Sequence, residues 1–162
     1  MAAHERALIH YAWRMTGNLE QARDVVQDTF LRACQADQGD LAGREAPWLY
    51  RVCRNRTLDV LKKEQRMQTL EPNQAEARPS PGPSPAEAAS ENETGRQLQA
   101  AMEHLDEKQA EVFRLKFQHQ MSYKEISEVT GFPVNNVRYL IHTALKVLRE
   151  QLRGQVNLAA QL

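Results

Sequence analysis

A proline-rich stretch in the middle of the chain places the strongest constraint on its fold. Residues 78–85 read RPSPGPSP, and a helix cannot continue through repeated prolines because each lacks an amide hydrogen and crowds the preceding turn. The surrounding residues 67–95 carry one basic side chain against five acidic ones. We therefore expect an extended, flexible linker that buries no core. It separates an N-terminal domain, residues 1–66, from a C-terminal domain, residues 96–162.

Both domains are predicted to be helical, because apolar residues recur at spacings of three and four and no strand pattern of any length occurs. The first helix covers residues 5–16 and ends at Gly17. Asn18 is expected to cap a second helix, with Gln21 completing a capping box, and this helix runs to about Gln35. The expected fold class is all-α, with two small helical domains joined by the proline-rich linker.

A third helix follows a predicted loop at residues 37–45, which contains two glycines and has no periodicity. Pro47 suits the first position of this helix. Trp48 and Tyr50 either stack on unpaired bases, or Trp48 lies in the core and Tyr50 on the helix surface. The helix also carries a basic run that either binds phosphates or is an ordinary solvated face. Its members are Arg51, Arg54, Arg56, Lys62, Lys63 and Arg66.

The C-terminal domain is predicted to hold about four helices, of which the last two form a helix-turn-helix at residues 121–148. Two earlier helices start at Thr94 with Gln97 and at Asp106 with Gln109, each pair arranged as a capping box. In the helix-turn-helix, Ser122 and Glu125 form a further capping box. Gly131 then allows the left-handed turn that ends the first of the two helices.

The second helix of this pair has an apolar stripe that is expected to be buried. The stripe consists of Val134, Val137, Ile141, Ala144 and Leu148. Its polar side would enter a DNA major groove, where Asn pairs with adenine and Arg with guanine. The alternative is a helical hairpin with a polar outer face. The exposed candidates are Asn135, Asn136, Arg138, Tyr139 and His142.

The overall charge does not decide between these alternatives. The formal net charge is zero, but residues 1–66 and 96–162 each carry +2 while residues 67–95 carry −4. Cys34 and Cys53 have no metal or disulfide spacing and are predicted to be small core residues in a reducing compartment. No signal segment or membrane-length apolar run occurs. The protein is therefore expected to be cytoplasmic.

Nothing in the sequence points to an enzyme. The five histidines have no ligand spacing, no glycine-rich phosphate loop occurs, and no Ser or Cys stands in a nucleophile setting. We expect no catalytic residue, no metal and no cofactor.

Two separate parts of the chain resemble the extracytoplasmic function (ECF) sigma factors, the smallest class of the bacterial sigma-70 superfamily of RNA polymerase initiation subunits. ARDVVQDTFLRAC (22–34) and WLYRVCRNRTLDVLKK (48–63) are similar to the region-two helices of that family, and residues 105–148 resemble its region-four domain. The resemblance implies a subunit without an active site of its own. It would bind core polymerase, direct it to promoters and help to melt the −10 element.

The resemblance also implies roles for the matching residues. The polymerase-binding set comprises Asp24, Gln27, Asp28 and Arg32. The −10 set, beside a base-capturing loop at residues 37–45, comprises Trp48, Tyr50, Arg51, Arg54, Asn55, Arg56, Lys62 and Lys63. The −35 set comprises Asn135, Asn136, Arg138, Tyr139, His142 and Lys146. The implied partners are core RNA polymerase (β′ clamp helices and β flap), promoter DNA and an anti-sigma factor, and the free protein is expected to be a monomer.

The recognition helix departs from the pattern of the family. Leu140, Thr143 and Leu145 stand where the family often has basic residues, and Pro133 stands where a Ser or Thr cap is common. Together with Val147, the two leucines make the helix more apolar than one stripe requires. We therefore hypothesise that these side chains pack on a partner or on another part of the chain.

A stand-alone helix-turn-helix regulator is the alternative function. It would account for the C-terminal domain and would be expected to dimerise on a palindromic site. It leaves the basic helix of the N-terminal domain without a role.

Overall fold

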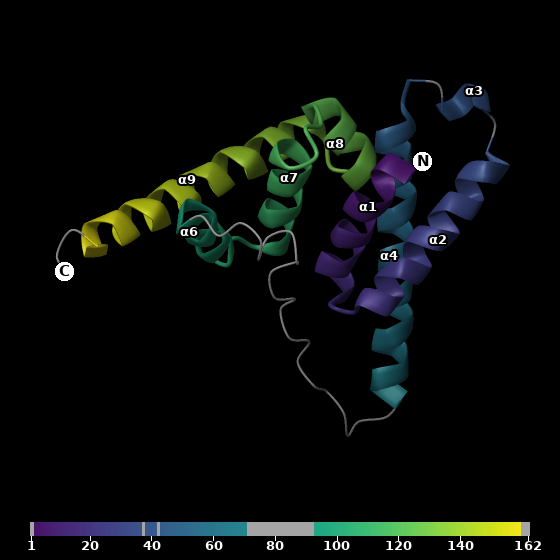
Figure 1. Cartoon of the computed structure of the whole chain (residues 1–162), viewed down its shortest axis with the longest axis horizontal. Coiled ribbons are helices and arrows are strands. Elements are labelled where there is room, and N and C mark those ends of the chain that lie inside the picture. The colour runs from purple at the N-terminus through teal and green to yellow at the C-terminus, as the bar shows by residue number, and fades with distance from the viewer. Residues whose placement is uncertain (1, 37, 42, 71–92, 160–162) are drawn as a thin grey trace. The chain divides into compact units, whose positions relative to one another are not determined.

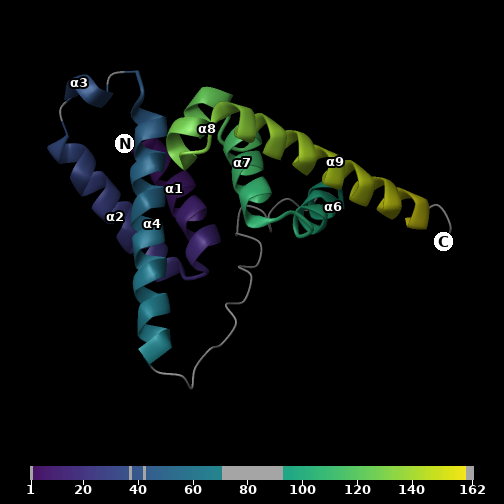
Figure 2. The same ribbon diagram turned by 180° about the vertical axis from the view of Figure 1, so that it is seen from behind.

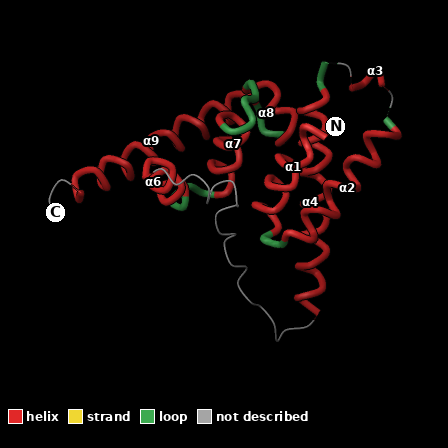
Figure 3. The backbone as a smooth tube through the Cα atoms, in the orientation of Figure 1, coloured by secondary structure: helices red, strands yellow, loops and turns green. Residues whose placement is uncertain are grey.

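The computed structural model of the chain describes residues 2–36, 38–41, 43–70 and 93–159. The chain divides into two compact units, residues 1–82 and 83–162. Within the described residues every regular element is a helix (Figure 3), so the all-α prediction is confirmed. The proline-rich stretch lies outside the described residues. None of the described helices is both long and apolar enough to span a membrane.

The first unit is built on three helices that pack against one another. These are α1 (Ala2–Thr16), α2 (Leu19–Gln35) and α4 (Glu45–Leu70), and Figures 1 and 2 show them side by side. The short helix α3 (Gln38–Leu41) lies between α2 and α4 in the sequence. The prediction of a loop over residues 37–45 was therefore wrong for these four residues.

The corner between α1 and α2 follows the predicted chemistry only in part. Gly17 has φ +68°, and Asn18 Oδ1 accepts hydrogen bonds from the amides of Glu20 and Gln21 at 2.9 and 3.2 Å. The capping box is not completed, because the Asn18 amide donates to Thr16 Oγ1 at 3.2 Å, while the Gln21 side-chain amide donates to the Glu64 carboxylate. Gln21 thus connects α2 to α4 across 43 residues of sequence.

Helix α4 is longer at both ends than the sequence pattern indicates. It begins at Glu45, so Pro47 lies inside the first turn rather than at the first position. The missing amide hydrogen of Pro47 costs nothing there, because amides of the first turn have no acceptor within the helix. It continues to Leu70, four residues past the predicted end of the domain at residue 66. The other end of the predicted linker is also helical from Glu93.

The core of the first unit contains one of the two cysteines. Leu8, Leu49 and Cys53 are fully buried. Burial raises the pKa of the Cys53 thiol from 9.0 to about 12, although the Thr57 and Thr29 hydroxyls favour the thiolate. Cys34, by contrast, is exposed, so its predicted core position was wrong.

The second unit consists of three shorter helices that each pack on one long helix. They are α6 (Glu93–Met102), α7 (Glu107–Phe117) and α8 (Tyr123–Thr130), and each contacts α9 (Val134–Ala159) (Figures 1 and 2). One cluster of the core joins α6, α7 and α9; it comprises Ala101, Met102, Phe113, Ala144 and Leu148. A second set of buried side chains joins α8 to its neighbours; it includes Val112, Leu115, Ile126, Val129 and Val137.

Side-chain caps begin two of these helices as predicted. Asp106 with Gln109 starts α7, and Ser122 with Glu125 starts α8, both as complete capping boxes. In the second box the Ser122 amide donates to Glu125 Oε2 at 2.7 Å. The predicted box at Thr94 was wrong, because α6 already begins at Glu93 and the Gln97 side chain donates to Glu93 at 3.0 Å.

The turn between α8 and α9 is tightly bonded. Gly131 has φ +77°, and its amide donates to the Ser127 carbonyl at 2.9 Å. The Ser127 hydroxyl donates to the Phe132 carbonyl at 2.6 Å, and the Phe132 amide donates to Thr130 Oγ1 at 3.2 Å. The turn therefore satisfies backbone groups with side chains and fixes the direction in which α9 leaves α8.

We predict opposite effects for alanine at two glycines of the second unit. Neither site has an atom within 4 Å of a new Cβ, but Gly131 has φ +77° whereas Gly154 lies within α9. Gly131→Ala should destabilise the unit by about 1 kcal/mol, and Gly154→Ala should stabilise α9 by about 0.5–1 kcal/mol. Amide hydrogen exchange in peptides from α8 and α9 measures both effects, with α1 peptides as the internal control. Equal effects at the two sites would contradict the assigned backbone conformations.

We also predict that the two thiols differ sharply in reactivity. In the native chain, a disulfide reagent at mildly alkaline pH should modify the Cys34 thiol quickly. The Cys53 thiol should react only when the protein unfolds. Cys34→Ser should abolish the fast reaction. Since the unfolded Cys53 thiol ionises near 9.0 and the folded thiol near 12, the free energy of unfolding should fall as pH rises through this interval. Two fast equivalents in the native protein would refute the burial of Cys53.

Candidate nucleic-acid interface

The outer side of α9 presents every residue of the predicted −35 set. All six side chains are exposed: Asn135, Asn136, Arg138, Tyr139, His142 and Lys146. On the opposite side of the same turns, Val137, Ile141 and Ala144 are buried. Helix α9 therefore has the two-sided character of a helix that is anchored in a small domain and offers polar groups to a groove.

Arg138 does not project freely from this surface. Its guanidinium carbon lies 5.6 Å from the centre of the Tyr123 ring at the start of α8. Lys116 lies 5.0 Å from the same ring centre, and its ammonium also donates to the Met121 carbonyl at 3.2 Å. The ring attracts both cations, so two positive charges gather where α8 meets α9.

The apolar excess of the recognition helix is mostly absorbed by its own domain. Leu140 is only 8% exposed, Leu145 packs against the core cluster, and Val147 is half-buried. Thr143 accepts a hydrogen bond from the Gln109 side-chain amide at 3.1 Å. Leu140 and Leu145 therefore pack within their own domain, the second of the two possibilities in the hypothesis, whereas for Val147 a partner contact stays a prediction.

On α4, part of the predicted −10 set forms one continuous stripe. Trp48, Arg51, Asn55 and Lys62 follow one another at spacings of three, four and seven residues, which places them on one side of the helix. Arg66, one turn further, extends this surface, here called the α4 stripe. Its polar members are exposed, and Trp48 is half-buried.

Other members of the −10 set lie elsewhere. Tyr50 is 2% exposed and meets the Tyr11 ring edge-on at 5.2 Å, so its predicted surface position and DNA contact were wrong. Burial also raises the pKa of its phenol above the usual range. Arg54 is half-buried and Lys63 is exposed. Each is the sequence neighbour of a stripe residue, Asn55 and Lys62 respectively, and adjacent residues of a helix point to different sides.

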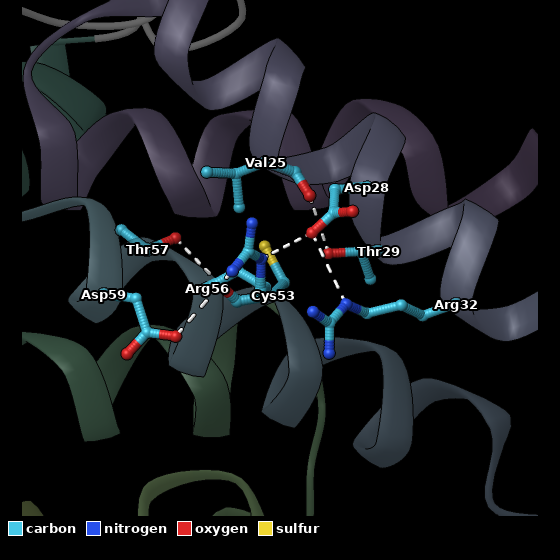
Figure 4. Close-up of polar contacts among 8 residues, drawn as sticks. All are labelled: Val25, Asp28, Thr29, Arg32, Cys53, Arg56, Thr57 and Asp59. Carbon is cyan, nitrogen blue, oxygen red and sulfur yellow. Dashed lines mark hydrogen bonds and ion pairs between the residues drawn. The ribbon is translucent and has the colours of Figure 1, made fainter.

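Arg56, from the predicted −10 set, and Asp28, from the predicted polymerase set, bind each other. Arg56 Nε lies 2.5 Å from Asp28 Oδ2, and the same oxygen lies 3.4 Å from Arg32 Nε (Figure 4). Arg56 also reaches Asp59 at 3.9 Å. The two residues thus form an ion pair between α4 and α2, and their assignments to DNA and to polymerase stay predictions.

The outer face of α2 retains the remaining predicted polymerase residues. Asp24, Gln27 and Arg32 are exposed, and Leu31, one turn beyond Gln27, is 58% exposed. The sequence analysis missed Leu31, although its spacing from Asp24 and Gln27 places it on their side of the helix. A groove between α1 and α2 runs beside this face and is lined in part by Ile9, Phe30 and Cys34.

The described part of the chain contains no group of three His, Cys, Asp or Glu side chains placed to hold a metal ion. The α4 stripe and the outer side of α9 instead bring together arginine, lysine, asparagine and aromatic side chains. Such groups bind phosphates and bases.

Comparison with known proteins identifies both units. Residues 1–67 match the model of Sigma-70 region 2, and residues 95–148 match that of Sigma-70, region 4. The chain is 31% identical over 150 residues to the ECF RNA polymerase sigma factor SigW of Bacillus subtilis, covering 87% of this chain and 80% of SigW. It is 29% identical to SigE of Mycolicibacterium smegmatis, covering 98% of this chain but only 62% of that protein.

A solved structure shares the fold. The sigma factor RpoE of Bartonella quintana, determined in complex with the anti-sigma factor NepR, superposes with a TM-score of 0.71 over 94% of this chain and 93% of RpoE, at 19% identity. Taken with the match to SigW, the two region matches in their order along the chain show that this chain belongs to the ECF RNA polymerase sigma factors.

Proposed function

We propose that this sigma factor carries core RNA polymerase to promoters by dividing the work among three surfaces. The outer face of α2 binds polymerase, the outer side of α9 reads the −35 element, and the α4 stripe holds the melted −10 strand. One observation carries the proposal most directly. Two separately folded units each expose a basic and amide-rich helix side, one suited to a duplex groove and the other to an unpaired strand.

The α9 surface suits duplex recognition. Asn135 and Asn136 stand in the first turn, where a recognition helix meets base edges, and an Asn amide can pair in two-pronged fashion with adenine. Arg138, held against Tyr123, is directed to guanine or to a phosphate. Lys146, Arg149 and Arg153 lie further along the same side and are proposed to contact phosphates.

The α4 stripe suits a single strand. An aromatic ring beside arginine, lysine and asparagine is the combination that stacks a base and neutralises its phosphates. Helix α3 and its neighbours, residues 37–45, precede the stripe in the sequence and are proposed to capture a flipped base. Residues 37 and 42 of that segment lie outside the described residues.

The α2 face is proposed to dock on the β′ clamp helices, with Asp24 and Gln27 around the exposed Leu31. An apolar side chain ringed by polar ones is the usual composition of a protein interface. The second unit is proposed to bind the β flap. An anti-sigma factor is proposed as the regulator, by analogy with the NepR complex of RpoE.

Run-off transcription tests the function. Bacterial core polymerase is incubated with a pool of promoter fragments, with and without the purified full chain. We expect transcripts that require the protein, and their start sites will reveal the −10 and −35 elements. No transcript and no co-elution with core would favour the stand-alone regulator, which should instead dimerise on a palindrome.

The α4 stripe generates a specific prediction. Replacing Arg51 and Asn55 together by Ala should lower open-complex formation by about tenfold or more, because one phosphate contact and one base contact are lost. Binding to core polymerase should stay unchanged. Arg6→Ala, which removes an exposed arginine from α1, is the matched control and should behave as wild type. If the double variant loses core binding and strand opening in parallel, the stripe is part of the polymerase interface rather than a DNA surface.

A further inference from the structure

The Asp28–Arg56 pair lies at the rim of the crossing between α2 and α4. Immediately beside it, Thr29 and Thr57 are fully buried, and each hydroxyl donates to the carbonyl four residues earlier, Val25 and Cys53, at 2.8 Å (Figure 4). The Cys53 thiol contacts both hydroxyls. Three small side chains therefore let the helices approach closely at this point, and the charged pair closes the edge of the contact.

Helical phase separates Arg56 from the α4 stripe. Residues three or four apart share a side of a helix, whereas those one or two apart do not. Arg56 lies three and four residues from Cys53 and Val60, and Asn55 lies four from Arg51. Arg56 thus occupies the side of α4 that faces α2, and the stripe occupies another.

The contact atoms are shielded although the side chains are not. Arg56 Nε and Asp28 Oδ2 are buried from solvent, while the two side chains are 35% and 37% exposed. The N–H is not aligned with the oxygen as in a linear hydrogen bond, so the attraction is that of an ion pair. A bridge of this kind adds little to stability, but it restrains how α4 rotates and slides against α2.

We propose that the Asp28–Arg56 pair positions the α4 stripe relative to the polymerase-binding face of α2, so that both residues act in promoter opening without touching DNA. The inference rests on the proposed function of those two surfaces. Docking on polymerase fixes the position of α2 relative to the enzyme. The ion pair then fixes where the stripe meets the melted strand.

A direct role for Arg56 predicts an effect of opposite sign. If Arg56 bound a phosphate, Asp28 would compete with that phosphate, and Asp28→Asn would strengthen strand binding. If the pair positions the stripe, Asp28→Asn weakens strand opening as Arg56→Gln does. In that case the double variant is no worse than the worse single variant, because one contact is lost in all three.

The experiment measures promoter opening by the full chain with saturating core polymerase. The affinity of each variant for core polymerase is measured separately. Melting curves followed by circular dichroism are used to choose an assay temperature at which every variant is folded. We expect Asp28→Asn and Arg56→Gln each to slow opening about threefold to tenfold, with non-additive effects in the double variant. Arg96→Gln is the control: it removes an exposed ion pair, Arg96 with Glu93 at 3.0 Å, that lies within α6 and in none of the proposed binding surfaces, so it should behave as wild type.

The outcomes separate the hypotheses. Faster or unchanged opening with Asp28→Asn, or additive losses, would overturn the positioning role while leaving the sigma function intact. If promoter opening falls in proportion to the affinity for core polymerase, Asp28 belongs to the polymerase interface, and this result too would overturn the positioning role. Should a single variant fail to fold, the exchange Asp28→Arg with Arg56→Asp replaces it, and recovery of opening is expected only if the bridge matters. Wild-type protein that gives no transcript would overturn the proposed function itself.

Discussion

The close crossing of α2 and α4 is the contact on which the first unit depends. Thr29, Cys53 and Thr57 are fully buried there, and a larger side chain at any of them would push the helices apart. Both threonines satisfy their hydroxyls within their own helix, so polar groups enter the core without an unpaired donor. Because the two helices are also proposed to carry the polymerase and −10 surfaces, their packing sets the geometry between those surfaces.

Local signals in the sequence predicted local structure well. The capping boxes at Asp106 and Ser122, the cap at Asn18 and the left-handed Gly131 all involve residues within a few positions of one another, so pattern alone suffices to find them. The six exposed residues of α9 were predicted for the same reason, because their burial follows the phase of one strongly periodic helix.

Contacts between distant segments could not be predicted in this way. Gln21 fits a local capping box equally well, and only the packed structure pairs it with Glu64. Arg56 was assigned to a basic face by composition. Its phase with Cys53 and Val60 pointed inward, but no pattern named Asp28 as its partner. Tyr50 was expected to stack on a base or to lie on the helix surface, but it is buried with Leu49 and Cys53.

The recognition helix has one physiological consequence. Its outer side carries four exposed cations, Arg138, Lys146, Arg149 and Arg153, of which the last three follow one another at spacings of three and four. Four phosphate contacts would displace about four counterions, so a doubling of ionic strength would weaken duplex binding by this unit about tenfold. If these side chains contact promoter DNA as proposed, a rise in the internal salt of the cell would weaken that contact to the degree usual for a small DNA-binding domain.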